Sequence, residues 1–230
     1  MELFLRLLLA HTLGDFVFQS AGLVEMKRQG MKGLAIHFGV VAFWTFALVW
    51  NYPKYNWAIA SLLSLMHFAA DWARYYWRPH NPLEELASFL GDQTLHIGLI
   101  MGTMAAFGIT IPWNEFSLPA NLPGHLKLML ALLLFIFLLW IVPLLEKMVV
   151  EISPYCSHSR HQIKVEPAQR FVGAVERVLA VVIFVRVSPF LSLLVFIPRI
   201  FTGPRRRCAL YRAAVSLALT LPVASYLAKF

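Results

Sequence analysis

The chain has 230 residues, of which 59% are hydrophobic and 14% charged, and its formal net charge is +8. A soluble domain has about 45–50% apolar and about 25% charged residues, so this composition excludes an ordinary soluble core and indicates a protein embedded in lipid. The basic residues are spread through loops without interleaved aromatics, which argues against a nucleic-acid partner and suits anionic membrane lipids.

A membrane-spanning helix needs about 20 mostly apolar residues. Stretches of this kind predict an all-α, polytopic transmembrane helix bundle of seven to eight membrane segments, forming a single integral membrane domain over residues 1–230. Segment 189–201 is short for a span and is a candidate re-entrant element. In chain order, the expected segments are 2–23, 33–50, 56–75, 85–110, 124–146, 169–185, 189–201 and 208–228.

Lysine and arginine are concentrated in alternate loops. The odd-numbered loops hold most of them, including a long loop at about 147–168 and the run Arg205, Arg206 and Arg207. The even-numbered loops hold only Lys54, Lys127 and Arg186. The positive-inside rule therefore predicts that the odd loops, including 147–168, are cytoplasmic and that both termini lie outside. We expect the three consecutive arginines to contact anionic headgroups.

Ionisable side chains inside a span cost roughly 2.5–3.5 kcal/mol each, yet several predicted spans carry them. Three spans each hold a His and a carboxylate four residues apart, a spacing that places both on one face of a helix. These pairs are His11 with Asp15, His67 with Asp71, and Asp92 with His96. The other polar residues of interest in the spans are Gln19, His37, Gln93, Glu176 and Arg177.

These groups also lie at matching depths. Counted along each span, they fall in the leaflet that the predicted topology makes cytoplasmic, and they come from five different helices. A structural ion-pair network explains any single pair, but the convergence of five helices at one depth favours a shared site. The sequence therefore predicts an intramembrane His/Asp/Glu site in the cytoplasmic half of the bundle.

Two further features carry less weight. Cys156, His158 and His161 are metal-binding residue types in one short run, but they occupy a polar loop without an obvious fourth ligand, which favours a solvated segment. Neither Cys156 nor Cys208 belongs to a CxxC pair, so the spacing supports neither a disulfide nor a zinc ribbon.

Several motifs occur together in a fixed order: HTLGDFVFQ in the first helix, a His in the second, HFAAD in the third, FLGDQTLH in the fourth and RFVGAVERVL near the sixth. This set resembles the bacterial membrane-protein family of domain of unknown function 3307, over nearly the whole chain. The resemblance implies a polytopic protein of the bacterial inner membrane and brings no activity with it. The back half departs from the family pattern, since SPFLSLLVFIPRIFTG keeps Arg199 but lacks a lysine found in other members.

One class of function that fits this site is a metal-dependent hydrolase acting on a lipid headgroup from the cytoplasmic leaflet. Imidazole and carboxylate suit a divalent metal such as Zn, Fe or Mn, and a bound ion lowers the pKa of its water to about 7. The predicted ligands are His11, Asp15, His67, Asp71, Asp92 and His96.

The remaining polar residues would support this chemistry. Gln19 and Gln93 would orient the ligands, while Glu176 would be the general base. We expect His37 or Arg177 to contact a phosphate. Only Arg177 and Arg199 are placed to neutralise the buried carboxylates, so a divalent cation would balance the remaining negative charge.

Two other classes of function stay open. One is a proton- or cation-coupled membrane transporter, because series of His and carboxylate side chains carry protons and cations through membranes. The scarcity of ionisable groups in the outer half of the bundle argues mildly against it. The other is a membrane scaffold or accessory subunit, in which buried polar groups specify helix packing.

Overall fold

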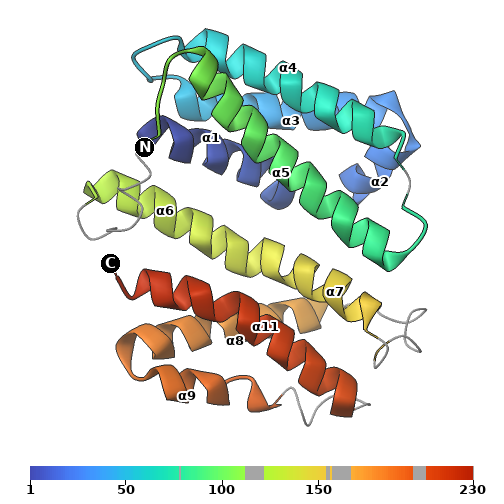
Figure 1. The fold of residues 1–230 in the computed structure, drawn as a ribbon, viewed down its shortest axis with the longest axis vertical. Coiled ribbons are helices and arrows are strands. Elements are labelled where there is room, and N and C mark those ends of the chain that lie inside the picture. The colour runs from blue at the N-terminus through green and yellow to red at the C-terminus, as the bar shows by residue number, and fades with distance from the viewer. Residues whose placement is uncertain (78, 112–121, 154–155, 157–166, 199–205, 230) are drawn as a thin grey trace. The chain divides into compact units, whose positions relative to one another are not determined.

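The computed structural model describes residues 1–77, 79–111, 122–153, 156, 167–198 and 206–229, with the backbone alone at 167–170 and 206. Within these ranges the protein is all-helical and contains no strand, which confirms the predicted all-α class. The chain divides into two compact units (Figure 1). The first unit comprises Met1–His80 and Ala87–Leu133, and the second comprises Asn81–Leu86 and Leu134–Phe230.

The first unit is built around one central helix, α3. This helix contacts α1, α2 and α4, and it runs beside α4 (Figure 1). The elements in chain order are α1 (Glu2–Thr12), the π-helix η1 (Leu13–Val17), α2 (Ala21–Gln29), α3 (Met31–Val49), α4 (Asn56–Tyr75) and α5 (Pro82–Ala106), of which α5 belongs to this unit from Ala87 onward.

The first predicted segment, 2–23, is broken rather than continuous. The π-helix η1 follows α1, and the backbone N–H of Phe18 donates to the carbonyl oxygen of Leu13 at 2.9 Å, which closes a five-residue turn. The chain then turns by 88° into α2. The Ser20 hydroxyl accepts from the backbone N–H of Leu23 at 3.2 Å, which caps the new helix and favours its start at this point.

The contact between α2 and α3 requires a residue without a side chain. A Cβ added to Gly33 would stand 2.1 Å from the carbonyl carbon of Met26, so only glycine lets the backbone of α2 approach the start of α3 so closely. Gly30, which joins the two helices, has a φ of 152°, a conformation that L side chains rarely adopt. The two glycines thus fix the position of α2 against α3.

The second unit is a group of helices in which α11 packs against α7 and α8, while α8 also contacts α9 and η4. Its apolar core includes Leu138, Val142 and Val181. Because α7 continues to Ile152, the predicted loop at about 147–168 begins with helix. The elements are α6 (Gly124–Ile136), which starts in the first unit, the π-helix η4 (Phe137–Ile141), α7 (Val142–Ile152), α8 (Pro167–Arg186), α9 (Pro189–Leu194) and α11 (Arg206–Leu227).

Three helices of the described chain are long and apolar enough to cross a membrane: Met31–Val49, Gly124–Ile152 and Arg207–Leu227. The bent pair Glu2–Val17 and Ala21–Gln29 makes a fourth if it forms one broken span. The structure therefore does not support the predicted seven to eight membrane segments. Helices α4 and α5 have 20 and 25 residues, but their His, Asp, Glu and Arg side chains lower their hydropathy.

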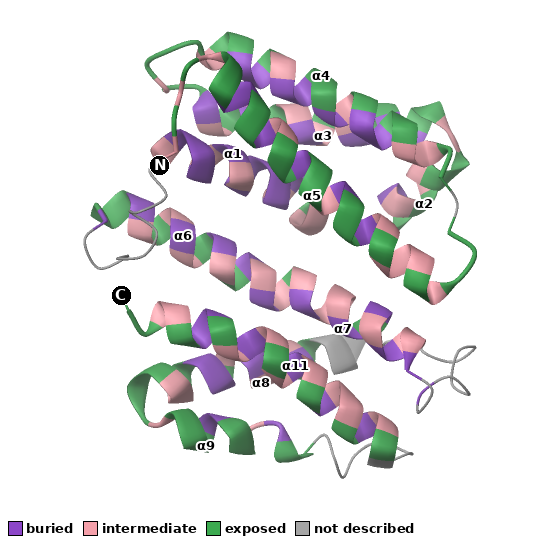
Figure 2. Cartoon of the chain, viewed as in Figure 1, coloured by how far each residue is buried: buried purple, intermediate pink, exposed green. Residues whose placement is uncertain are grey.

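The burial pattern is consistent with membrane association. Helix α4 buries Ser64, His67 and Asp71, whereas its Leu65 and Met66 are 59% and 42% exposed. Figure 2 shows buried and exposed residues alternating along this helix. Polar side chains inside and apolar side chains outside suit a lipid solvent, in which an exposed leucine carries no penalty.

A disulfide joins Cys156 to Cys208 in the second unit, so the expectation of no disulfide was wrong. The two cysteines are 52 residues apart in sequence, and their Cα atoms lie 5.3 Å apart because the fold brings them together, which CxxC spacing does not report. Of the other loop residues singled out by sequence, His158 and His161 lie outside the described residues.

The lipid contacts expected at the start of α11 stay a prediction. Arg205 lies outside the described residues, and Arg206 is described by its backbone alone. The side chain of Arg207 is exposed.

Replacing Cys208 with serine should lower the stability of the second unit by about 2–4 kcal/mol, because the bridge restricts the unfolded chain. Thermal unfolding of the detergent-purified protein measures this effect. Reductant should lower the melting temperature of the wild-type chain to that of the variant and leave the variant unchanged. Equal melting temperatures for the oxidised wild type and the variant would contradict a stabilising bridge.

Candidate metal centre

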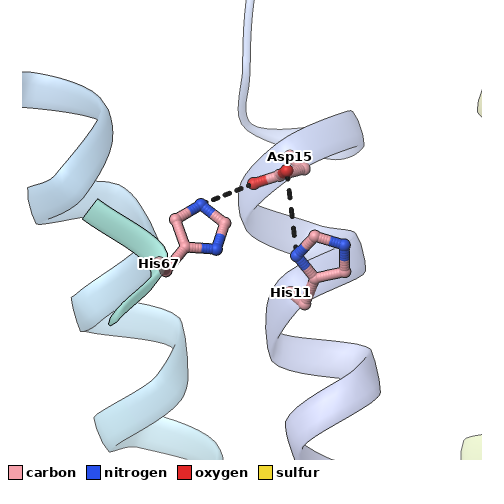
Figure 3. A group of neighbouring side chains, drawn as sticks. All are labelled: His11, Asp15 and His67. Carbon is pink, nitrogen blue, oxygen red and sulfur yellow. Dashed lines mark ion pairs between the residues drawn. The ribbon is translucent and has the colours of Figure 1, made fainter. Parts of the chain in front are cut away.

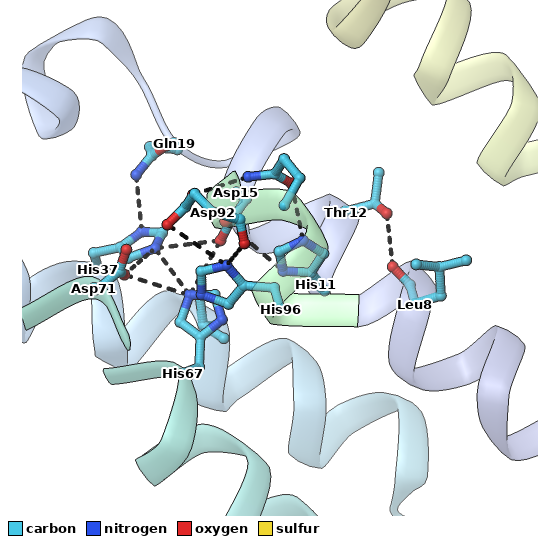
Figure 4. A network of polar contacts seen from close by, with 12 residues as sticks. Leu8, His11, Thr12, Asp15, Gln19, His37, His67, Asp71, Asp92 and His96 are labelled. Carbon is cyan, nitrogen blue, oxygen red and sulfur yellow. Dashed lines mark hydrogen bonds and ion pairs between the residues drawn. The ribbon is translucent and has the colours of Figure 1, made fainter. Parts of the chain in front are cut away.

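Seven buried histidine and aspartate side chains meet inside the first unit (Figure 4). Each side chain is at most 7% exposed, although all of them are strongly hydrated when free in water. We call this group the polar cluster. It consists of His11 from α1, Asp15 from η1, His37 from α3, His67 and Asp71 from α4, and Asp92 and His96 from α5.

Helical spacing explains how α4 and α5 contribute two side chains each. His67 and Asp71 are four residues apart and lie on the buried face of α4, and Asp92 and His96 are arranged in the same way on α5. The two helices meet where the His67 and His96 ring centroids are 4.1 Å apart. Local i,i+4 geometry thus builds each pair, and helix packing joins the pairs.

The contribution of η1 depends on Gly14. A Cβ at this position would stand 2.9 Å from Val41 Cγ2 and 3.3 Å from Val41 Cα, so glycine lets η1 lie directly against the backbone of α3. The next residue, Asp15, reaches His37 of α3 and His67 of α4 as a result. Figure 3 shows Asp15 between His67 and His11. A π-turn at such a point is typical of functional sites.

Four atoms of the polar cluster are joined by five nearly equal separations, each of which involves an imidazole nitrogen. His37 Nε2 is 3.3 Å from Asp15 Oδ1 and 3.1 Å from Asp71 Oδ2. His67 Nε2 is 3.3 Å and 3.4 Å from the same two oxygens, and the two Nε2 atoms are 3.4 Å apart. We call these four atoms the cage. They could hold a metal ion, since His37, His67 and Asp71 already form one of the ligand groups close enough to do so.

Two side chains of the bent segment support the cage. Lys27 Nζ donates to Asp71 Oδ1 at 2.9 Å, which leaves Oδ2 for the cage. With its amide oxygen turned toward the donors, Gln19 accepts from Lys27 Nζ at 3.1 Å and from His37 Nδ1 at 3.3 Å, and its amide nitrogen donates to the Asp15 carbonyl oxygen at 2.9 Å. A proton on His37 Nδ1 leaves the lone pair of Nε2 facing the cage.

The other side of the polar cluster is organised by Arg74 and Gln93. Asp92 Oδ2 accepts from Arg74 Nη1 at 2.5 Å and from Gln93 Nε2 at 3.0 Å. The Gln93 Oε1 then lies 3.2 Å from His11 Nε2. His96 Nδ1 lies 2.8 Å from the carbonyl oxygen of Asp92. Every carboxylate and imidazole on this side therefore has an oriented partner.

Glu176 and Arg177 belong to the second unit, where Arg177 has its own partners. Arg177 Nη1 lies 3.6 Å from Glu146 Oε2, and Arg177 Nε donates to the carbonyl oxygen of Leu138 at 2.8 Å. The phosphate contact expected of Arg177 and the general-base role expected of Glu176 stay predictions. The second arginine expected to neutralise carboxylates, Arg199, lies outside the described residues.

Lys27 and Arg74 are counter-ions of the polar cluster, and both are among the basic residues that the sequence placed in the odd-numbered loops. Each lies near the end of a helix, where a long side chain can reach back to a buried carboxylate. Arg74 pairs with Asp92, 18 residues further along the chain, so the only signal in the sequence was its place one turn after Asp71 on α4. Lys27 offered none, because its reach depends on the 88° turn before α2.

One protein-family model matches this chain, over residues 3–123 of the 230. The family is described as a protein of unknown function, DUF3307. The chain therefore belongs to this family, as its first four motifs indicated, while RFVGAVERVL lies outside the matched range, so the resemblance over nearly the whole chain is not confirmed. The matched range contains the whole polar cluster together with Gln19, Lys27, Arg74 and Gln93, and it ends before Glu176. No curated protein and no solved structure matches the chain.

Replacing Gly14 with alanine should push η1 away from α3 and cost about 1–3 kcal/mol of stability, as overpacking does. The matched control is Gly39→Ala, also in the first unit, where an added Cβ meets nothing within 4 Å. That change should alter stability by no more than about 1 kcal/mol, in the stabilising direction. Denaturant unfolding of both variants in detergent decides the matter, and equal effects would contradict the close approach of η1.

Proposed function

We propose that this DUF3307 protein binds a divalent metal ion of zinc size in the cage, and that it is a metal-dependent hydrolase working at the membrane surface. The observation that carries the proposal is the geometry of the four cage atoms, Asp15 Oδ1, His37 Nε2, His67 Nε2 and Asp71 Oδ2. This assignment gives His37 a ligand role in place of the phosphate contact expected from sequence.

The cage distances fit metal ligands better than hydrogen bonds. Ligand atoms about 2.0–2.1 Å from a tetrahedral Zn²⁺ stand about 3.3–3.4 Å from one another. The five separations that join the two imidazoles to each other and to the carboxylates span 3.1–3.4 Å. A direct hydrogen bond between a charged imidazole and a carboxylate would be about 2.7–2.9 Å. Within the described chain, Asp15 Oδ1 has no hydrogen-bond partner although it is buried.

The surroundings of the cage also suit a cation. Asp15 and Asp71 bring two negative charges, and Lys27 brings one positive charge. Buried charges are stable only when they are paired or bind a metal. The Gln19 oxygen holds His37 in the tautomer that a metal requires, which is how outer partners orient ligating histidines.

The place of the cage along α4 supports action on a lipid headgroup. Asp71 lies about one turn before Tyr75, where the helix ends, and Trp72, Tyr76 and Trp77 around this end are 45–69% exposed. Tryptophan and tyrosine gather at the interface between lipid and water. We infer that the cage lies just below this interface, where an ion that expands its coordination beyond the four cage atoms could activate water toward a phosphate or ester group. The cytoplasmic leaflet of the bacterial inner membrane follows from the charge of the loops.

Cation-coupled transport is the second candidate, and buried hydroxyl groups favour it. Ser64 on α4 and Thr103 on α5 are each 2% exposed, and their oxygens have no hydrogen-bond partner among the described residues. They lie one and two turns from His67 and His96, on the side away from the aromatic end of α4. Hydroxyl oxygens in such positions could extend a route for cations beyond the polar cluster.

Protein purified without chelator should carry a bound divalent transition metal, measured by elemental analysis. Asp71→Asn should reduce metal affinity more than about 100-fold, and Gln19→Ala by about 10–100-fold, since losing an orienting partner costs less than losing a ligand. The matched control, Glu25→Gln, removes an exposed carboxylate of α2 and should keep the metal. Metal content that is unchanged in Asp71→Asn would refute the cage.

Metal-loaded protein in phospholipid vesicles should release a water-soluble headgroup or phosphate, and Asp71→Asn should abolish this release. Transport makes a different prediction: zinc or protons should enter the vesicles, and Ser64→Ala and Thr103→Ala should slow that flux while sparing the bound metal. Flux without lipid cleavage would replace the hydrolase by the transporter.

A further inference from the structure

Two buried imidazole nitrogens of the polar cluster lack hydrogen-bond partners within the described chain: Nδ1 of His11 and Nε2 of His96. The residues are 6% and 2% exposed, so water does not satisfy these atoms from outside. Neither nitrogen is one of the four cage atoms. A buried polar group without a partner costs about 1–3 kcal/mol, so two of them side by side call for an explanation.

A chain of contacts fixes the tautomer of His11. Arg74 and Gln93 both donate to Asp92 Oδ2, which orients the Gln93 amide nitrogen toward that carboxylate. The Gln93 oxygen must then face His11 Nε2, 3.2 Å away, and an oxygen there requires a proton on Nε2. The unpartnered Nδ1 of His11 is therefore a lone pair.

His96 is held in the same way by a different acceptor. Its Nδ1 lies 2.8 Å from the carbonyl oxygen of Asp92, which accepts a proton but cannot donate one. The unpartnered Nε2 of His96 is therefore a lone pair as well. Ligating histidines typically place one ring N–H on a carbonyl or carboxylate and present the other nitrogen to the metal.

Both histidines lie beside a carboxylate oxygen that the cage does not use. Asp15 contributes Oδ1 to the cage, and its Oδ2 is 3.7 Å from His11 Nδ1 (Figure 3). Asp15, Asp92 and His96 also offer ligand atoms that all lie within 4.8 Å of one another. Figure 4 shows the side chains of Asp15, Asp92 and His96 close together in the polar cluster.

We infer that the polar cluster holds a second divalent cation, bound by His11, His96, Asp92 and the Oδ2 of Asp15, so that Asp15 bridges two ions. This inference rests on the proposed cage. A shared carboxylate is compatible with the roughly 3.5–4 Å between ions in two-metal hydrolytic sites. Asp92 would use Oδ1, because Oδ2 accepts from Arg74 and Gln93.

The second position differs from the cage in two respects. His11 Nδ1 and Asp15 Oδ2 stand 3.7 Å apart, farther than the 3.1–3.4 Å separations of the cage, so these groups close less tightly around an ion and leave room for water. It also adds only one further carboxylate, Asp92, which Arg74 already pairs. We expect the second ion to bind more weakly than the first and to carry the open coordination position that catalytic sites keep.

The experiment uses the full-length protein in detergent, stripped with chelator and titrated with Zn²⁺ alone. Elemental analysis after removal of free metal should give two ions per chain for the wild type. His11→Gln and His96→Gln should each lose the weaker ion and keep the other. Asp15→Asn should lose both. The matched control, His125→Gln, changes a histidine whose side chain is 58% exposed and should keep both ions.

Cobalt(II) provides a readout that a folding defect does not imitate. The first equivalent should give the strong visible absorption of tetrahedral Co²⁺, and the second should add the weak absorption of an ion with more ligands. One ion per chain in the wild type, retained by both histidine variants, would overturn the second site and leave the cage standing. No bound ion in the wild type would overturn the cage and the second site together.

Discussion

The structure of the first unit depends on one constraint: charged groups withdrawn from water must find partners inside the fold. Three carboxylates and four imidazoles occupy its interior, and each carboxylate is approached by a cation or an imidazole. Lys27 and Arg74 reach in from helix ends, and two glutamines connect neighbouring groups. Removing one member of a buried ion pair lowers the free energy of unfolding by roughly 3–5 kcal/mol, because the remaining charge stays buried without a partner.

The sequence contained the local part of this arrangement. The i,i+4 spacing of His67 with Asp71, and of Asp92 with His96, is a property of any helix, so both pairs could be predicted before the fold was known. The depth of the groups along the first four spans also indicated that they share one region, whereas the fifth contribution, from Glu176 and Arg177, belongs to the second unit and stays a prediction. The same argument identified His37 as a member of the site. It did not predict that His37 lies in the cage, because this depends on how closely η1 approaches α3.

The other features of the fold and the site could not be predicted from the sequence, because they depend on tertiary structure. The turn after Val17 changes the direction of the chain by 88°, and only that turn brings Lys27 over Asp71. The pairing of Cys156 with Cys208 joins residues 52 positions apart. The structure supports fewer membrane segments than predicted, because the polar side chains of α4 and α5 leave these long helices outside the candidate spans.

Each unit places a π-turn where its chain meets a buried charge: η1 carries Asp15, and the Leu138 carbonyl of η4 accepts from Arg177. A π-turn is an α-helix with one additional residue, so it is readily gained or lost by a single insertion or deletion. Losing one residue from 13–17 would restore an ordinary helix and rotate Asp15 away from α3. A lineage could therefore discard the chemistry of this site while keeping, or even improving, the stability of its helix. In any relative, the length of this short turn is a simpler marker of a working site than the identity of its histidines.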